Sequence, residues 1–372
     1  MNLNVSRRVE PSKTIANVTA LRLLSTYCLV IYHGRPALLS AGFSDQFVGI
    51  LRAGTDLFLV CSAFLAIHTN SSKPTTGRRF FIKRAVRIVP LYWIITLLVF
   101  VLSAAVPTLF QATRPEISEL LKSLFFIPYE KKNHAIQPMV FVAWTLNYIM
   151  LFAVIYAASI GMVGGPRAWI VAIILLCCLM VAGVAHNFEA AALRFYTSPI
   201  LADFIFGIIL SKFYNLSTWA SRLHPRRNQE VIFLLLAALS AFAMICLQPY
   251  LWPHIHRSIG LGIPCLVLIG LAIRAEILGV KIKCWSIKEL SKFTFSIYLS
   301  HFFCTGLLAL FVKRNNPLSL SELAVGLSAT ILGSTILGCV LFYLVESPIA
   351  RLFRSHSTEV TRAPRLIGDR MQ

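Results

Sequence analysis

The sequence is divided into apolar blocks near twenty residues long, and this division limits the chain to one class of fold. A helix of about twenty residues crosses roughly 30 Å of hydrocarbon, because each residue rises about 1.5 Å. Ten blocks can be marked, at residues 15–33, 47–68, 88–106, 138–160, 168–186, 198–213, 231–249, 257–274, 292–312 and 322–346. We therefore expect an all-α, polytopic membrane protein with about ten transmembrane helices.

The composition agrees with that class. Of 372 residues, 57% are hydrophobic and only 13% are charged, whereas soluble domains carry about 25% charged residues. The nine cysteines lie mostly within apolar blocks and form no C-x-x-C pattern. We interpret them as small hydrophobic residues and expect neither a disulfide framework nor a metal site.

Positive charge is distributed unevenly between the two ends of the blocks. One side, with the N-terminus, every second connection and the C-terminal tail, holds 24 Lys and Arg, and the other side holds 9. Because Lys and Arg accumulate in cytoplasmic loops, both termini are expected in the cytoplasm. The same rule explains the net charge of +20, so nucleic acid is not an expected partner. We expect a membrane-embedded domain over residues 1–350 and a basic cytoplasmic tail over 351–372.

Ionisable side chains inside the apolar blocks are the first candidates for function, because a charge in hydrocarbon is costly. Arg22 and His33 are eleven positions apart, which places them within about 20° of one helix face and about 16 Å apart along its axis. A guanidinium can bind phosphate or stabilise an oxyanion, and a histidine can accept a hydroxyl proton. The alternative is structural: Arg22 extends to the interface and His33 caps the helix.

Asp56 lies in the second block, within the segment Gly54–Phe64. At that depth a carboxylate needs a partner, so we expect Arg22, Arg52 or a histidine to neutralise it.

Two further pairs have both a structural and a functional interpretation. Arg84 and Arg87 lie one turn apart before the third block, where they either anchor the span or receive a phosphorylated cofactor. Tyr298 and His301 are spaced i,i+3 in the ninth block and share one helix face. They either line a substrate channel or pack as buried, hydrogen-bonded residues. The connection Pro107–Pro138 is the longest, and its middle predicts a short amphipathic helix around residues 116–126.

Seven segments in order make the sequence more specific. They are Arg22-x10-His33, Gly54–Phe64, Phe80–Trp93, Trp144-Thr145-Leu146-Asn147, Asp203-Phe204-Ile205-Phe206-Gly207, Ser296–His301 and Val345-Glu346-Ser347-Pro348. Together they resemble the acyltransferase-3 family of integral membrane acyltransferases over roughly residues 15–350. The sequence of the Trp144–Asn147 segment is most similar to that of the branch that acetylates bacterial exopolysaccharides and other cell-surface glycans.

The resemblance implies a ten-helix fold in the bacterial plasma membrane and O-acyl transfer, most simply O-acetyl transfer. It implies acyl-CoA as donor substrate, with no bound cofactor, and a polysaccharide or lipid-linked oligosaccharide as acceptor, in contact with membrane lipid. The family's essential pair maps onto Arg22 and His33. On this interpretation Arg84 and Arg87 bind the nucleotide end of the donor, and Asp56, Tyr298 and His301 support catalysis.

Two positions depart from the family pattern. Ala63 replaces a usual glycine, and Ile149 replaces the glutamate that usually lies five residues after Trp144. Two alternatives therefore stay open. One is a transporter or flippase for a sugar or lipid-linked intermediate, although no inverted repeat is visible. The other is a non-catalytic homologue, which the missing carboxylate at Ile149 would explain.

Overall fold

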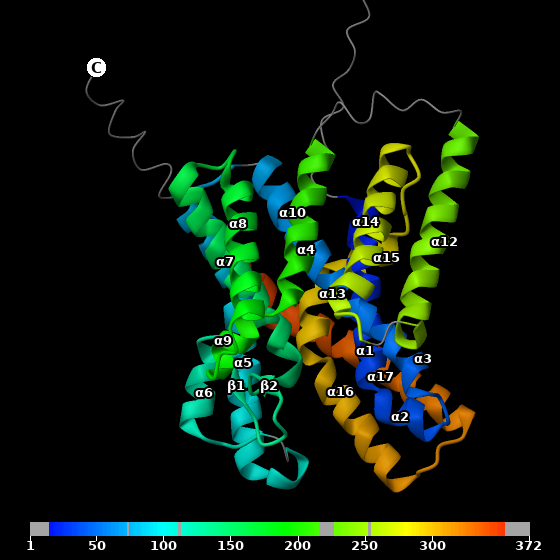
Figure 1. Ribbon diagram of the computed structural model, residues 1–372. Helices are drawn as coiled ribbons and strands as arrows, with labels where there is room; N and C mark the ends of the chain where they lie inside the picture. The colour runs from blue at the N-terminus through cyan, green and yellow to red at the C-terminus, as the bar shows by residue number, and fades with distance from the viewer. Residues whose placement is uncertain (1–14, 73, 111–112, 216–226, 252–253, 354–372) are drawn as a thin grey trace, which may run out of the picture.

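A computed structural model describes residues 15–72, 74–110, 113–215, 227–251 and 254–353, and these residues are almost entirely helical (Figure 1). Ten long helices form the body of the molecule: α1 (Ala16–His33), α4 (Ala53–Ser72), α5 (Gly77–Ala105), α7 (Trp144–Val163), α8 (Ala168–Ala185), α10 (Ala202–Asn215), α12 (Arg227–Leu251), α14 (Gly262–Ile277), α16 (Thr294–Arg314) and α17 (Leu320–Leu341). Each coincides with one of the ten blocks expected from the sequence.

Short elements connect the long helices. They are α2 (Arg35–Ser40), α3 (Asp45–Gly49), η1 (Ile50–Arg52), η2 (Pro107–Leu109), α6 (Ile117–Leu124), β1 (Tyr129–Glu130), β2 (Ile136–Gln137), η3 (Phe141–Ala143), α9 (Ala191–Tyr196), η4 (Pro199–Leu201), α13 (Arg257–Gly260), α15 (Trp285–Leu290), η5 (Ser291–Phe293) and η6 (Phe342–Glu346), the last a π-helical turn. The antiparallel pair β1–β2 is the single sheet among the described residues. Helix α6 confirms the amphipathic helix expected within the longest connection.

Eight helical segments in the described part of the chain are long and apolar enough to cross a membrane. The other two long helices are α1, which is 18 residues long and includes Asn17 and Arg22, and α12, whose apolar stretch is Leu234–Tyr250. Helix α1 packs against α4, α14 and α16 inside the bundle. The structure thus shows a multi-pass, all-α membrane protein, while a count of ten crossings stays a prediction.

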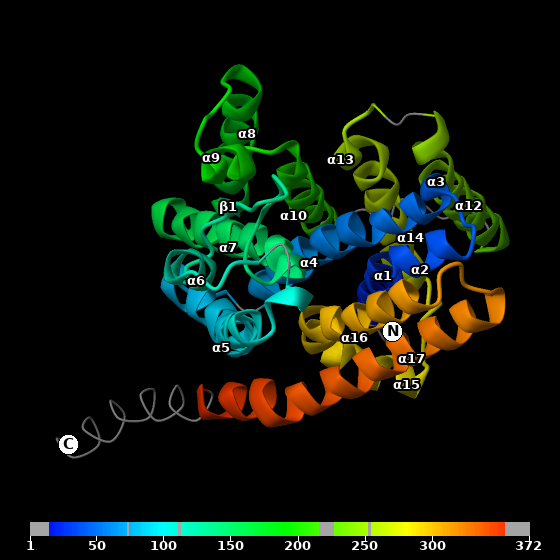
Figure 2. The same ribbon diagram turned by 90° about the horizontal axis from the view of Figure 1, so that it is seen from below.

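The long helices form two groups joined by α4 (Figure 2). Helices α5, α7, α8 and α10 lie on one side, and α1, α12, α14, α16 and α17 lie on the other. Helix α17 runs along one flank, from α2 to the π-helical turn beside α5. The close approach of α4 and α10 depends on Gly207, where a Cβ would come within 2.5 Å of the Ala63 Cβ and of the Val60 carbonyl oxygen.

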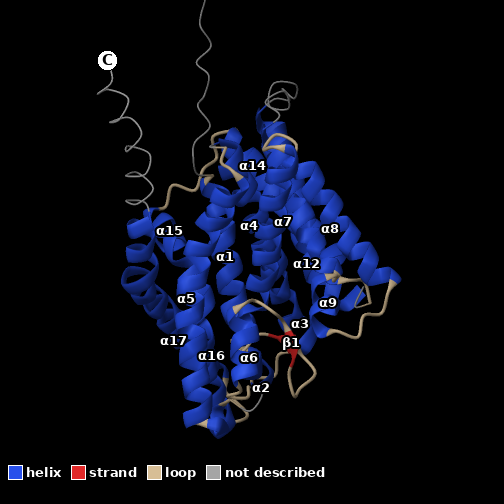
Figure 3. Ribbon diagram, turned by 90° about the vertical axis from the view of Figure 1, so that its left-hand side faces the viewer, coloured by secondary structure: helices blue, strands red, loops and turns tan. Residues whose placement is uncertain are grey.

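The two ends of the bundle differ (Figure 3). The loop end carries α2, α3, α6 and the β1–β2 pair, and the opposite end, where α1 begins, is the terminal end. Two predicted boundaries were wrong. Helix α7 begins at Trp144, since residues 138–143 run through a short turn first, and α5 begins at Gly77, capped by Thr76. The predicted tail over 351–372 lies beyond the described residues from position 354 onward.

Candidate active site

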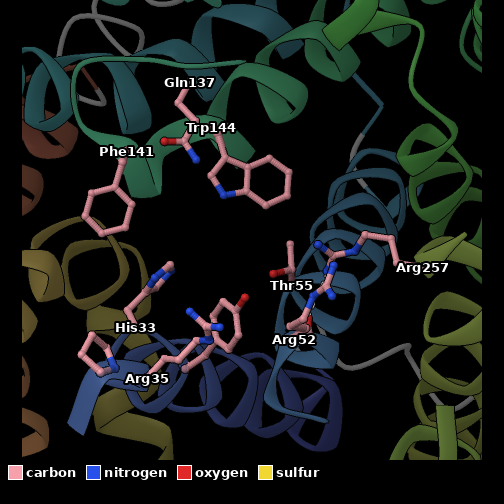
Figure 4. Close-up of a pocket in the computed structure, with 10 residues that line it drawn as sticks. His33, Arg35, Arg52, Thr55, Gln137, Phe141, Trp144 and Arg257 are labelled. Carbon is pink, nitrogen blue, oxygen red and sulfur yellow. Dashed lines mark hydrogen bonds between the residues drawn. The ribbon is translucent and has the colours of Figure 1, made fainter. Parts of the chain in front are cut away.

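A cavity of about 470 Å³ opens among the helices at the loop end. Its lining comes from α1, the short elements around it, the start of α4, the segment before α7 and the start of α13 (Figure 4): Tyr32, His33, Arg35, Pro36, Arg52, Thr55, Gln137, Phe141, Trp144 and Arg257. Its volume falls in the range of small-ligand sites, roughly 300–1,000 Å³. Of the residues predicted from the sequence, His33 lines it directly.

His33 lies at the last turn of α1 with aromatic rings on two sides. Its ring centroid is 5.2 Å from the ring centroid of His301 on α16 and 5.2 Å from that of Phe141. The segments that carry these two histidines are separated by more than 260 positions in the sequence, and the bundle brings them into contact. An imidazole at the wall of a cavity can accept or donate a proton for a bound ligand.

His301 is wholly buried, and its orientation is set by a hydrogen bond. Its Nδ1 lies 2.6 Å from the Tyr298 carbonyl oxygen, so Nδ1–H donates and the neutral ring keeps a lone pair on Nε2. Within the described residues Nε2 has no hydrogen-bond partner. His301 therefore retains an unused acceptor beside His33.

Tyr298 links this histidine to the segment that begins α7. Its hydroxyl donates to the Val142 carbonyl and lies 2.5 Å from the Thr145 Oγ1. The Tyr298 ring stacks on Phe58 of α4, with centroids 4.9 Å apart. Tyr298 thus links α4, α7 and α16, and these contacts hold His301 and the Trp144–Asn147 segment in place.

Asp56 has a partner that the sequence did not suggest. The expected neutralising groups were Arg22, Arg52 or a histidine, and this expectation was wrong. The Arg257 guanidinium donates to both oxygens of Asp56, at 2.6 Å and 3.3 Å. The Asp56 carboxylate is fully buried, whereas the Arg257 side chain is 18% exposed at the cavity.

The cavity contains residues that were not predicted as site residues. Arg257 also donates to the Arg52 carbonyl oxygen and lies 5.9 Å from the centre of the Trp144 ring. Arg257 belongs to a Pro-His-Ile-His-Arg segment that resembles an ordinary solvated loop, so the sequence carries no signal for it. Trp144 was part of a recognised segment, and its position at the start of a span was the available clue.

Arg22, Arg84 and Arg87 lie away from the cavity, toward the terminal end. Arg22 donates to the Ser291 carbonyl oxygen at 3.3 Å, and Arg84 donates to that of Ser62 at 3.2 Å. Arg22 lies within electrostatic range of both Arg84 and Arg87. The three guanidinium groups therefore form one cluster, which the sequence had assigned to two separate segments.

Glu346 is the carboxylate of this cluster. Its side chain is 7% exposed, lies 3.3 Å from the Arg87 Nε and accepts a hydrogen bond from the Ser296 hydroxyl. Neither Arg22 nor Arg84 forms an ion pair within the described part of the chain. Arg22 and Arg84 therefore make no direct contact with a carboxylate among the described residues, although Arg22 also lies within electrostatic range of Glu346.

Ile149, the position of the missing family glutamate, is 4% exposed and belongs to the main hydrophobic core. Phe152, Ala153 and Leu146 of the same helix are buried in that core too. The side chain is therefore packed as an ordinary core residue.

A polar cavity with adjacent histidines, set in a bundle of apolar helices, defines a multi-pass membrane protein with an internal site of the kind that enzymes and transporters use. Comparison with known families separates these two classes. Residues 15–344 match the family described as an acyltransferase domain, and the chain belongs to this acyltransferase-3 family.

One curated relative is the exopolysaccharide production protein ExoZ of Rhizobium meliloti (strain 1021). It is 28% identical over 307 residues, a match that covers 82% of this chain and 90% of ExoZ. No solved structure matches the chain.

Proposed function

We propose that this protein is an O-acyltransferase that moves an acyl group, in the simplest case acetyl, from acyl-CoA to a hydroxyl of an exopolysaccharide or its lipid-linked precursor. Family membership supports the transfer chemistry, and the similarity to ExoZ supports the acceptor class. The observation that carries the proposal is the contact of His33 with His301 at the wall of a cavity that also presents aromatic rings. We place the protein in the bacterial plasma membrane, with both termini cytoplasmic.

His33 is the proposed general base. It takes the proton from the acceptor hydroxyl while that oxygen attacks the thioester carbonyl carbon, forming the ester bond as the carbon–sulfur bond breaks. The proton on His33 then passes to the departing CoA thiolate, so the histidine returns to its neutral form. Such proton transfer accounts for roughly 10²–10⁴-fold in rate.

His301 and Tyr298 are positioning residues in this scheme. The Tyr298 carbonyl accepts a hydrogen bond from the His301 Nδ1–H, which leaves the buried Nε2 as an unused acceptor among the described residues. Its ring lies against the ring of His33, where it limits the rotation of the imidazole and disfavours a second positive charge. Asp56 acts one step further away, because it fixes Arg257 beside Trp144.

The donor is proposed to enter from the terminal end. Arg22 and Arg84 make no ion-pair contact among the described residues, and guanidinium groups match phosphate geometry with paired hydrogen bonds. Arg87 already pairs with Glu346, so it contributes less to the binding of the nucleotide. Helix α1 carries both Arg22 and His33, about 16 Å apart along its axis, a separation that an extended pantetheine arm can bridge.

Acyl transfer in membranes tests the proposal. Membranes that contain the protein would be incubated with radiolabelled acetyl-CoA and with lipid-linked or polymeric glycan, and the ester-bound label would be measured. Mass spectrometry of surface polysaccharide from cells with and without the gene would identify the modified residue. A transporter or a non-catalytic homologue would leave the ester content of the glycan unchanged at equal glycan export, and this result would refute the proposal.

A further inference from the structure

The cavity carries more positive charge than transfer to a neutral hydroxyl requires. Its lining includes Arg35, Arg52 and Arg257, and none of the residues that line it is an Asp or a Glu. Among the lining residues, the remaining titratable side chains are those of Tyr32 and His33. Proton removal from a sugar hydroxyl uses the histidine and gives no role to three guanidinium groups.

Two of these arginines already have carboxylate partners. Arg257 pairs with Asp56, and Arg35 pairs with Asp45 at 2.7 Å on the exposed surface. The guanidinium of Arg52 makes neither an ion pair nor a hydrogen bond within the described residues; only its backbone carbonyl is used, by Arg257. Arg52 is therefore the cavity arginine without a direct side-chain partner among the described residues; its side chain is exposed and lies within electrostatic range of Asp45.

Two aromatic side chains line part of the cavity wall. Figure 4 shows Phe141 across the open space from Arg52 and Thr55, and Trp144 facing the same space. The Trp144 ring is held beside the Arg257 guanidinium. Flat aromatic rings present apolar surface to the C–H faces of a sugar ring, while a guanidinium pairs with carboxylate or phosphate oxygens in two-point contacts.

We propose that this cavity selects an acceptor with a negatively charged group, which Arg52 binds while the sugar ring lies against Trp144 and presents a hydroxyl to His33. The proposal rests on the proposed function and names its acceptor class: an anionic glycan unit. The oxyanion has two possible sources, the carboxylate of an acidic sugar or the phosphate that links the glycan to a lipid carrier. Both would be recognised by the same guanidinium.

Binding measured without catalysis tests this directly. Purified protein in nanodiscs, with no acyl donor present, would be titrated with a tritiated oligosaccharide that ends in glucuronate and with its carboxyl-reduced counterpart, which ends in glucose. We expect the glucuronate form to bind about tenfold more tightly or better, because a hydrogen bond to a charged group outweighs a neutral one. Arg52→Gln should bring the ratio of the two affinities close to one and leave the affinity for the neutral form unchanged.

Arg314→Gln is the matched control, because Arg314 is an exposed arginine at the loop end of α16 and does not line the cavity. It should retain the full preference for the charged sugar. Arg52→Lys should retain part of it, since a lysine keeps the charge but loses the planar contact.

Competition distinguishes the two sources of the oxyanion. A short-chain citronellyl pyrophosphate would be added to the neutral oligosaccharide and separately to the glucuronate form. If the pyrophosphate displaces the glucuronate form from the wild type but not from Arg52→Gln, the site binds oxyanions of either source. Whichever of the two ligands binds more tightly, the glucuronate oligosaccharide or the pyrophosphate, then identifies the natural source. Equal affinity for charged and neutral sugars in the wild-type protein, together with no Arg52-dependent binding of the pyrophosphate, would overturn the inference. Because no acyl donor is present, that result leaves the transfer activity itself untouched.

Discussion

Asp56 and Arg257 are 201 positions apart, yet the Arg257 guanidinium donates two hydrogen bonds to the Asp56 carboxylate. The pair joins α4 to the start of α13, at the point where both elements reach the cavity. A buried carboxylate without this partner would carry a large desolvation cost. The ion pair therefore fixes the position of a cavity residue as well as the packing of two helices.

Asp56→Asn should destabilise the protein more than a surface change does. It removes the carboxylate that accepts both Arg257 hydrogen bonds, and breaking a buried pair typically costs about 3–5 kcal/mol. Thermal unfolding in detergent should show a clearly lower midpoint. The double variant Asp56→Leu/Arg257→Met removes both charges and should recover much of the loss. A single variant as stable as the wild type would show that the pair does not contribute to stability.

Ile149→Glu should unfold the protein or lower its yield. The side chain is 4% exposed within the main core, and an unpaired carboxylate there costs several kcal/mol unless it is protonated. Ile149→Leu, which keeps volume and polarity, should cost less than about 1.5 kcal/mol. Higher turnover in a well-folded Ile149→Glu protein would instead show that the carboxylate typical of the family can be restored.

The helices and their order could be predicted from the sequence because membrane spans depend on local composition. Blocks of apolar residues identified all ten long helices, and amphipathic spacing identified α6. The boundary of α7 was wrong because residues 138–143 are apolar as well, and hydrophobicity alone does not separate a buried turn from a buried helix.

The site was only partly predictable for the same physical reason. Arg22, His33, Asp56 and His301 stand out because each is a polar group in an apolar block. Arg52 was named only as a possible partner of Asp56, and Arg257 was not singled out, since both lie at the ends of apolar blocks, where arginine is common. Which arginine reaches Asp56 depends on how α13 folds over α4, a tertiary contact that no local pattern encodes.

Lys131 should make the stability of the loop end depend on pH. This lysine lies in the connection before α7 and is 5% exposed, with its Nζ donating to the Thr113 hydroxyl and the Met139 carbonyl. Burial lowers the pKa of Lys131 to about 8, against a smaller opposing effect of Glu119. Between that pKa and the ordinary value near 10.5, the unfolded chain binds more protons than the folded one, so stability should rise with pH across this interval.

The measurement is the thermal midpoint at pH 7 and pH 10, compared between the wild type and Lys131→Met. The methionine keeps the length of the side chain and removes the titration. From pH 7 to pH 10, the thermal midpoint of the wild type should rise relative to that of Lys131→Met. Parallel pH profiles would show that Lys131 does not influence stability in this way.

The asymmetry of 24 against 9 basic residues predicts which side of the membrane each end of the bundle faces. Epitope tags can be inserted at Gly165, between α7 and α8, and at Asn133, in the exposed β1–β2 connection. The Asn133 tag should bind antibody on spheroplasts with an intact plasma membrane, and the Gly165 tag only after permeabilisation. Both tags on the same side would contradict the predicted topology.

Substitutions of Arg22 and His33 should reduce acyl transfer for different reasons. His33→Ala removes the proposed base, so transfer should fall by roughly 10²–10⁴-fold. Donor binding should remain, because a general base acts mainly in the transition state. Arg22→Lys should also lose activity, but through weaker binding of the donor, since an ammonium cannot reproduce the planar two-point contact.

Two measurements on each variant separate these effects: binding of labelled acetyl-CoA, and ester transfer to glycan over a range of donor concentrations. His33→Ala should bind the donor as the wild type does and transfer roughly 10²–10⁴-fold more slowly, whereas Arg22→Lys should require much more donor for half-maximal transfer. His186→Ala, which changes an exposed histidine at the end of α8, is the control and should behave as the wild type in both assays. Wild-type transfer by a folded His33→Ala protein would remove the general-base role from His33. The neighbouring imidazole of His301, with its free Nε2 acceptor among the described residues, would then be the group to change next, and a double variant would show whether either ring suffices.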